Sequence, residues 1–249
     1  MAIEPATTGG WWDVVGAGRV GRAIAAALTE AGASVRGPHG RGANGRGARA
    51  VILCVPDREI EAASAAIAAG PYVGHVSAST PLDLLAPHAR FMMHPLLSIV
   101  GPGAAFTGAT CAIDGSSPDA LAIAEELAGL LGMRARVIPP EFRALYHAAA
   151  SASSNYVTTV LGMAEALAEK VGLDRLALLP LVQAAVEQWA SNGAPLALTG
   201  PIARGDDTTV ERQRAAVAEH APPALELWDA LASATRILAS RRNNDTPPT

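Results

Sequence analysis

The stretch WDVVGAGRVGR, residues 12–22, joins an apolar run to a glycine-rich turn and to a helical pattern that continues through AIAAALTEAG. In such a segment Gly16 permits a tight turn, Gly18 lets the backbone approach a bound group, and Gly21 lets the helix pack closely on the strand. The N-terminus of that helix favours an anion. The spacing therefore predicts a site for the pyrophosphate of a dinucleotide, and a purely structural glycine turn is the alternative. The residues expected to contact the dinucleotide are Gly16, Ala17, Gly18, Arg19, Val20 and Gly21.

The end of the next apolar run, SVR at residues 34–36, indicates which dinucleotide fits. A site for NAD usually has Asp or Glu about 20 residues after the first glycine. This sequence has Arg36 there, and no acidic residue follows before Asp57. A guanidinium can bind a ribose 2′-phosphate, so we expect NADP, with Arg36 as the main ligand and Arg41 or His39 as other candidates. The alternative is that these arginines are solvated loop residues.

Short apolar runs alternate with helical patterns up to residue 138, which is typical of a mostly parallel sheet covered by helices. Beyond Pro139-Pro140 we expect helices at 142–171, 174–190, 208–220 and 223–240, whereas 195–207 is too rich in Gly, Pro and Asp to be helical. We therefore predict the α/β class, with a Rossmann-type NADP-binding domain in residues 1–140 and an all-helical substrate or dimerisation domain in residues 141–249. The expected strands are 12–15, 34–36, 50–55, 72–77, 90–94, 110–113 and 134–138.

Composition excludes several classes of protein. Half of the 249 residues are hydrophobic and the net charge is −4, so we expect a large core and no nucleic-acid binding. No signal peptide and no window of about 18 apolar residues are found, so we expect no membrane span and a cytoplasmic location. Cys54 and Cys111 lie in apolar runs, which argues against a disulfide or a zinc site. The single lysine, Lys170, excludes a Walker A loop and a Tyr-x-x-x-Lys dehydrogenase site.

Residues after the expected strands should line the cofactor crevice, because ligands bind at the carboxyl ends of strands in open α/β sheets. Val55 and Pro56 follow the third strand and Ser77 follows the fourth. His94 ends the fifth strand, where Pro95 stops it, so we expect His94 to face the cleft between the domains as a binding or proton-relay group. No metal site is expected.

The first long helix carries His147, Ser151 and Asn155 at positions i, i+4 and i+8, on one side of the helix. An imidazole can move a proton near neutral pH and an amide can bond a carbonyl oxygen, which suits reduction of C=O. A polar stripe bonded to a neighbouring helix is the alternative. In the loop ALTGPIARGDD, Arg204 could bind a substrate carboxylate or pair with Asp206 or Asp207.

The whole chain resembles dehydrogenases that join a Rossmann domain to a helical C-terminal domain, such as ketopantoate, prephenate and 6-phosphogluconate dehydrogenases or reductases. It resembles more closely a family of Rossmann-like NADP oxidoreductases whose helical C-terminal domain has no known function. The resemblance implies a homodimer formed through the helical domains. Because position 151 is Ser and Lys170 ends a helix, His147 would have to replace the lysine of the wider superfamily. The matching segments are GAGRVG (16–21), CVPD (54–57), MHPL (93–96), HAAASASSNY (147–156), LLPLV (178–182) and ALTGPIARGD (197–206).

These features together predict an NADPH-dependent oxidoreductase of the CH-OH/C=O couple. Its substrate would be a small carbonyl compound, such as the 2-oxo acid ketopantoate, by analogy of fold. The alternative is a non-catalytic NADP-binding sensor or partner protein.

Overall fold

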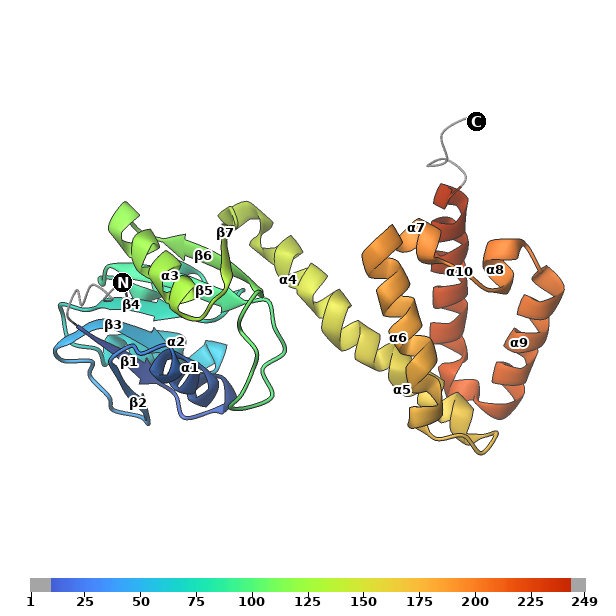
Figure 1. The fold of residues 1–249 in the computed structure, drawn as a ribbon, viewed down its shortest axis with the longest axis horizontal. Helices are drawn as coiled ribbons and strands as arrows, with labels where there is room; N and C mark the ends of the chain where they lie inside the picture. Colours follow the sequence, from blue (N-terminus) through green and yellow to red (C-terminus); the bar gives the residue numbers. More distant parts are fainter. Residues whose placement is uncertain (1–9, 243–249) are drawn as a thin grey trace, which may run out of the picture. The chain divides into compact units, whose positions relative to one another are not determined.

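Residues 10–242 are described in the computed structural model of the protein. Seven strands form one sheet in the order β2-β1-β3-β4-β5-β6-β7 (Figure 1). All neighbouring pairs are parallel except β5 and β6, which are antiparallel. The predicted α/β class is confirmed, and each expected strand is present. Their bounds are β1 Trp11–Val15, β2 Val35–His39, β3 Ala48–Leu53, β4 Tyr72–His75, β5 Arg90–Pro95, β6 Thr110–Gly115 and β7 Arg134–Val137.

Helices pack on the sheet and bury two apolar clusters. The larger cluster includes Ile52 and Phe91 of the sheet with residues of α1 (Arg19–Glu30) and α3 (Pro118–Leu130). The smaller cluster includes Val51 and Val73 and involves α2 (Ile60–Ala65) with the 3₁₀ turn η2 (Leu82–Leu85). The side chains of Val51 and Ile52 enter different clusters because successive residues of a strand point to opposite faces. Both faces of the central strands are therefore apolar, which explains why the strands read as continuous apolar runs.

Local signals set the ends of several helices as expected. The Ser117 hydroxyl accepts a hydrogen bond from the Ala120 backbone N–H at 3.2 Å, and Pro118 follows as the first residue of α3. The chain leaves this helix through Gly132, whose φ of 68° lies in the left-handed region.

The chain after the sheet is helical, with two differences from the prediction. A π-helical turn, η4 (Ala152–Tyr156), interrupts the expected helix 142–171. Residues 195–207, predicted to be non-helical, contain helical residues of α7 and α8, because Pro195 and Pro201 occupy first-turn positions that need no backbone N–H. The elements are η3 Pro140–Phe142, α4 Arg143–Ser151, α5 Val157–Glu169, α6 Arg175–Asn192, α7 Ala194–Ala197, α8 Pro201–Arg204, α9 Asp207–His220, η5 Pro222–Ala224 and α10 Leu225–Arg242; η1 is Asp57–Glu59 in the sheet region.

The chain divides into two compact units between Ser154 and Asn155. The sheet ends at Val137, and α4 still belongs to the first unit. No helix among residues 10–242 is long and apolar enough to cross a membrane.

Candidate functional site

The glycine turn between β1 and α1 has a conformation that side chains would prevent at two positions. Gly16 has φ 115°, and a Cβ atom there would collide with the carbonyl oxygen of Cys54. A Cβ atom at Gly21 would collide with the carbonyl oxygen of Gly16. At Gly18, by contrast, an added Cβ atom would have no atom of the described chain within 4 Å. Gly16 and Gly21 thus have the conformational roles that the spacing predicted, and Gly18 borders open space.

This open space belongs to a pocket of about 630 Å³ at the carboxyl ends of β1 and β3. Its size lies within the range of roughly 300–1,000 Å³ that is usual for small-molecule sites. The glycine turn forms one wall with Gly16, Ala17 and Gly18, and Val55 and Pro56 after β3 contribute to another. The remaining lining residues are Val15, Gly40, Arg41, Gly42, Ala43, Cys54, Glu59, Ala62, Ala63 and Ala66.

The pocket suits an anion. Gly18 caps α1 without a side-chain hydrogen bond, and no acidic residue lies in the first turn, which begins with Arg19 and Val20. The first-turn N–H groups of a helix have no partner within the helix, and the helix dipole places partial positive charge there. Arg19, Val20 and Gly21 are not lining residues themselves, so their predicted contribution reduces to these backbone groups.

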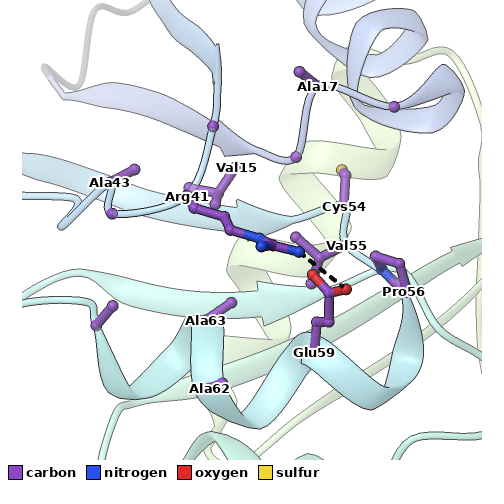
Figure 2. A pocket seen from close by; sticks show the side chains of 15 residues that line it. Val15, Ala17, Arg41, Ala43, Cys54, Val55, Pro56, Glu59, Ala62 and Ala63 are labelled. Carbon is purple, nitrogen blue, oxygen red and sulfur yellow. Dashed lines mark ion pairs between the residues drawn. The ribbon is translucent and has the colours of Figure 1, made fainter.

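Arg41 reaches over the pocket from the loop after β2. Its guanidinium points toward the Glu59 carboxylate, with a nitrogen–oxygen distance of 3.7 Å (Figure 2). The Arg41 side chain is 92% exposed, so this ion pair is screened by solvent and contributes little to stability. The arginine can therefore exchange Glu59 for a more highly charged ligand.

Arg36, the main sequence candidate for a 2′-phosphate ligand, is engaged elsewhere. Its Nε and Nη2 donate to Oδ1 and Oδ2 of Asp13 at 2.5 and 2.7 Å, and Nη2 also donates to the Arg46 carbonyl at 3.1 Å. The Asp13 side chain is only 5% exposed, and a buried carboxylate needs such a partner. This pairing argues against Arg36 as the phosphate ligand. Arg41, the other arginine that the sequence offered, is the one that lines the pocket.

Ser77 is buried and does not line the pocket. Its hydroxyl donates to Asp57 Oδ2 at 2.8 Å and accepts from the Thr80 backbone N–H and hydroxyl at 3.1 and 2.9 Å. These bonds tie the loop after β4 to the turn after β3. The structure therefore favours a supporting role for Ser77 over the direct cofactor contact that we expected.

His94 meets two residues of α4. Its Nδ1 lies 2.9 Å from the Tyr146 hydroxyl, and its ring lies edge-on to the rings of Tyr146 and His147 at centroid distances of 5.6 and 6.2 Å. An ion pair between Arg143 and Asp114 fixes the start of α4 to β6. His94 and His147, both predicted as site residues, are thus brought together.

Burial determines the protonation states of His94 and Tyr146. It lowers the pKa of His94 to about 4, with a smaller contribution from His147, and it raises the pKa of Tyr146 to about 12. Both groups are therefore neutral at pH 7. Burial also lowers the pKa of His75 on β4 to about 4; its Nδ1 accepts from the Ser77 N–H at 3.2 Å, while its buried Nε2 has no partner within residues 10–242.

The other predicted site residues are not gathered with this pair. Ser151 is the last residue of α4, and the π turn that follows breaks the repeat on which its alignment with Asn155 depended. Asn155 is exposed and begins the second unit. Arg204 is exposed at the end of α8 in that unit, where Asp206 instead caps α9 by accepting from Thr209. The roles proposed for these residues stay predictions.

Tyr146 was not among the residues predicted from the sequence. The signal was available, because Arg143, Tyr146 and His147 have the i, i+3, i+4 spacing of one helix face. Within residues 10–242 no group of three or more His, Cys, Asp or Glu side chains could hold a metal ion.

Comparisons with known proteins agree with this fold. A candidate NADP oxidoreductase of Bacteroides fragilis is 18% identical, with 91% of this chain and 98% of that chain covered and a TM-score of 0.78. A Thermotoga maritima protein is 21% identical, with 93% and 99% covered and a TM-score of 0.73. Pyrroline carboxylate reductase of Plasmodium falciparum, solved with NADP bound, is 11% identical, with 92% and 98% covered and a TM-score of 0.59.

No curated protein matches the sequence. The family model of a domain of unknown function, DUF2520, matches residues 109–235, just over half of the chain. The resemblance to a family with a C-terminal domain of unknown function is thereby confirmed, and the chain belongs to the DUF2520 family.

Proposed function

We propose that the protein is an NADPH-dependent oxidoreductase that reduces a C=O or C=N bond of a small molecule. The observation that carries the proposal is the pocket at the glycine turn, which combines open space at Gly18, the free N-terminus of α1 and the exposed guanidinium of Arg41. The similarity to a reductase solved with NADP supports it.

Two features of the pocket support NADP as its ligand. The backbone at Gly18 leaves room for the pyrophosphate, next to the amide groups of the first turn of α1. Arg41 is placed to bind the 2′-phosphate, whose charge exceeds that of the Glu59 carboxylate it now faces. When bound, NADPH supplies a hydride. The pocket residues bind and orient the dinucleotide.

The carboxyl end of β5, where His94 lies, is at the same edge of the sheet as the carboxyl end of β3, which supports a substrate site beside the cofactor pocket. β4 separates β3 from β5 in the sheet, so His94 lies two strands, about 10 Å, from the strand that borders the pocket. Hydride addition to a carbonyl carbon or imine carbon requires a proton for the oxygen or nitrogen. We assign that proton to His147, which is exposed beside His94.

Two substrate classes are compatible with this site. Fold analogy with ketopantoate reductase favours a 2-oxo acid, whereas the name of the Plasmodium falciparum relative points to a cyclic imine. A panel of 2-oxo acids, including ketopantoate, and of cyclic imines should therefore be tested by following NADPH absorbance with the full chain.

Consumption of NADPH with one class, and its loss in His147→Ala with little change in NADPH affinity, would support the proposal. His220→Ala is the matched control, because His220 is exposed at the end of α9 in the other unit. Absence of NADPH binding would overturn the proposal. NADPH binding without turnover of any compound in the panel would favour the alternative, a non-catalytic NADP-binding sensor or partner protein.

We also propose that the protein is a homodimer formed through its helical unit. None of the 18 residues of α6, all within the described chain, is buried. Leu176, Leu181 and Trp189 on this helix are 64%, 72% and 58% exposed. Large exposed apolar side chains gathered on one element are typical of a protein interface.

A further inference from the structure

Tyr146 and His94 form a pair that has more than one possible arrangement of hydrogens. The Tyr146 oxygen lies 2.9 Å from His94 Nδ1 and 3.4 Å from the His94 carbonyl oxygen. A phenol has one proton to donate, and a neutral imidazole has one N–H and one acceptor nitrogen. Either the phenol donates to Nδ1, or Nδ1–H donates to the phenol oxygen while the phenol donates to the carbonyl.

The geometry favours donation by the phenol to Nδ1. The shorter of the two contacts is the one to Nδ1, and a distance of 3.4 Å is long for an O–H···O bond. The phenol is therefore the donor and Nδ1 the acceptor.

The remaining nitrogen of His94 faces outward. Within residues 10–242, Nε2 has no hydrogen-bond partner, and it is not one of the buried polar atoms that lack one. It therefore reaches solvent. His75 has the same arrangement at Nδ1, which accepts from the Ser77 N–H, but its Nε2 is sealed in the interior. Of these two histidines, only His94 can present Nε2–H to a small molecule.

We propose that Tyr146 is a positioning residue that holds His94 as the neutral Nε2–H tautomer, so that the site offers an uncharged hydrogen-bond donor to the substrate. This inference rests on the proposed reductase function. It also narrows the substrate class. A carbonyl oxygen has lone pairs that can accept from Nε2–H at any pH, whereas a protonated iminium nitrogen has none. The pair therefore favours a carbonyl substrate over an iminium.

The groups around His94 are consistent with a neutral ring. His147 on α4 disfavours a charge on it, and Asp57 in η1 opposes this effect. The positive charge of Arg143 lowers the pKa of His75, and His94 has a smaller effect of the same sign on the pKa of His75. Burial is the largest of these influences on the pKa of His94.

Nitrogen-15 NMR of the full chain with labelled histidine tests the inference without any need for turnover. The signals of His94 are identified by their loss in His94→Gln, and His75 is the internal reference for an imidazole that accepts at Nδ1. We expect Nδ1 of His94 at neutral pH to have the shift of an unprotonated nitrogen that accepts a hydrogen bond, and Nε2 that of a protonated nitrogen. A protonated Nδ1 would overturn the proposal.

The variant Tyr146→Phe should move Nδ1 toward the shift of a free acceptor and raise the pKa of His94, because a bond to the neutral form is lost. If the enzyme is active, kcat should fall, and we take as a guide the loss of about 10- to 100-fold that follows removal of the hydrogen-bond partner of a metal-ligating histidine. The acidic limb of the pH profile should move upward with the pKa of His94. Tyr72→Phe is the matched control, because Tyr72 begins β4 and His75 ends it, and this variant should change none of these readouts.

Unchanged His94 signals in Tyr146→Phe would refute the role of Tyr146. If Tyr146→Phe does not fold, the spectrum of the native chain still decides the tautomer. Failure of the proposed reductase function can be distinguished from failure of this inference. In that case the native chain would not bind NADPH, while the NMR signals of His94 would still be as expected.

Discussion

The same substitution, glycine to alanine, should have opposite effects at neighbouring positions of the turn after β1. Gly18 has φ −74° and ψ −173°, an extended conformation that alanine adopts, and no described atom lies within 4 Å of the added Cβ. Alanine loses less entropy on folding, so Gly18→Ala should raise the free energy of unfolding by about 0.4–1 kcal/mol. The Cβ would nevertheless project into the space assigned to the pyrophosphate. We therefore expect NADPH affinity to fall about tenfold or more, equivalent to about 1.4 kcal/mol or more.

Gly16→Ala should instead destabilise the fold. Its φ of 115° strains a residue with a Cβ, and the Cβ would collide with the Cys54 carbonyl oxygen. Strain and overpacking of this kind cost about 2–6 kcal/mol together. Gly129→Ala is the matched control, because Gly129 lies in α3 of the same unit and an added Cβ there meets no described atom within 4 Å.

Thermal unfolding and NADPH titration of the three variants separate stability from binding. We expect a stable Gly18→Ala variant with weak NADPH binding, an unstable Gly16→Ala variant, and a Gly129→Ala variant with native affinity. A Gly18→Ala variant that binds NADPH as tightly as the native chain would refute the assignment of the turn to the pyrophosphate.

Four further predictions concern charged, titratable and apolar side chains. Arg41→Ala should weaken NADPH binding about tenfold and leave NADH binding unchanged; equal NADPH affinities of the native and Arg41→Ala proteins would contradict this prediction. Arg36→Ala should instead lower the free energy of unfolding by about 3 kcal/mol, because it leaves the Asp13 carboxylate buried without a partner. From pH 7 to pH 5 the free energy of unfolding in urea should fall by about 4 kcal/mol, with about 2 kcal/mol from each of His75 and His94, because in the unfolded chain each ring takes up a proton near pH 6.5 while in the folded chain it stays neutral to about pH 4. A flat profile over this range would be inconsistent with neutral buried rings. Trp189→Asp on α6 should convert a dimer to a monomer in light scattering, and a native chain that is already monomeric would disprove the dimer.

Much of the fold could be predicted because it depends on local patterns. Buried parallel strands appear as continuous apolar runs, as in residues 50–55, and Ser117-Pro118 marks a helix start by itself. The π turn at 152–156 could not be predicted, because its residues also fit an α-helix. The short helices α7 and α8 escaped prediction because proline is a helix breaker in the interior and a helix starter in the first turn.

The candidate site was harder to predict because it depends on contacts between distant residues. Arg36 occupies the expected position at the end of β2, but Asp13 on the adjacent strand is buried beside it and takes its guanidinium. No local pattern reveals that pairing. His94 and Tyr146 are 52 residues apart, so the bond between them follows only from the packing of α4 against β5.

The measurement that tests the central claim most directly is a titration of the native full chain with NADPH and with NADH, followed by nicotinamide fluorescence. We predict saturable binding of both, with NADPH bound about tenfold or more tightly because Arg41 contacts the 2′-phosphate. Equal affinities for the two dinucleotides, or no saturable binding of either, would contradict this claim.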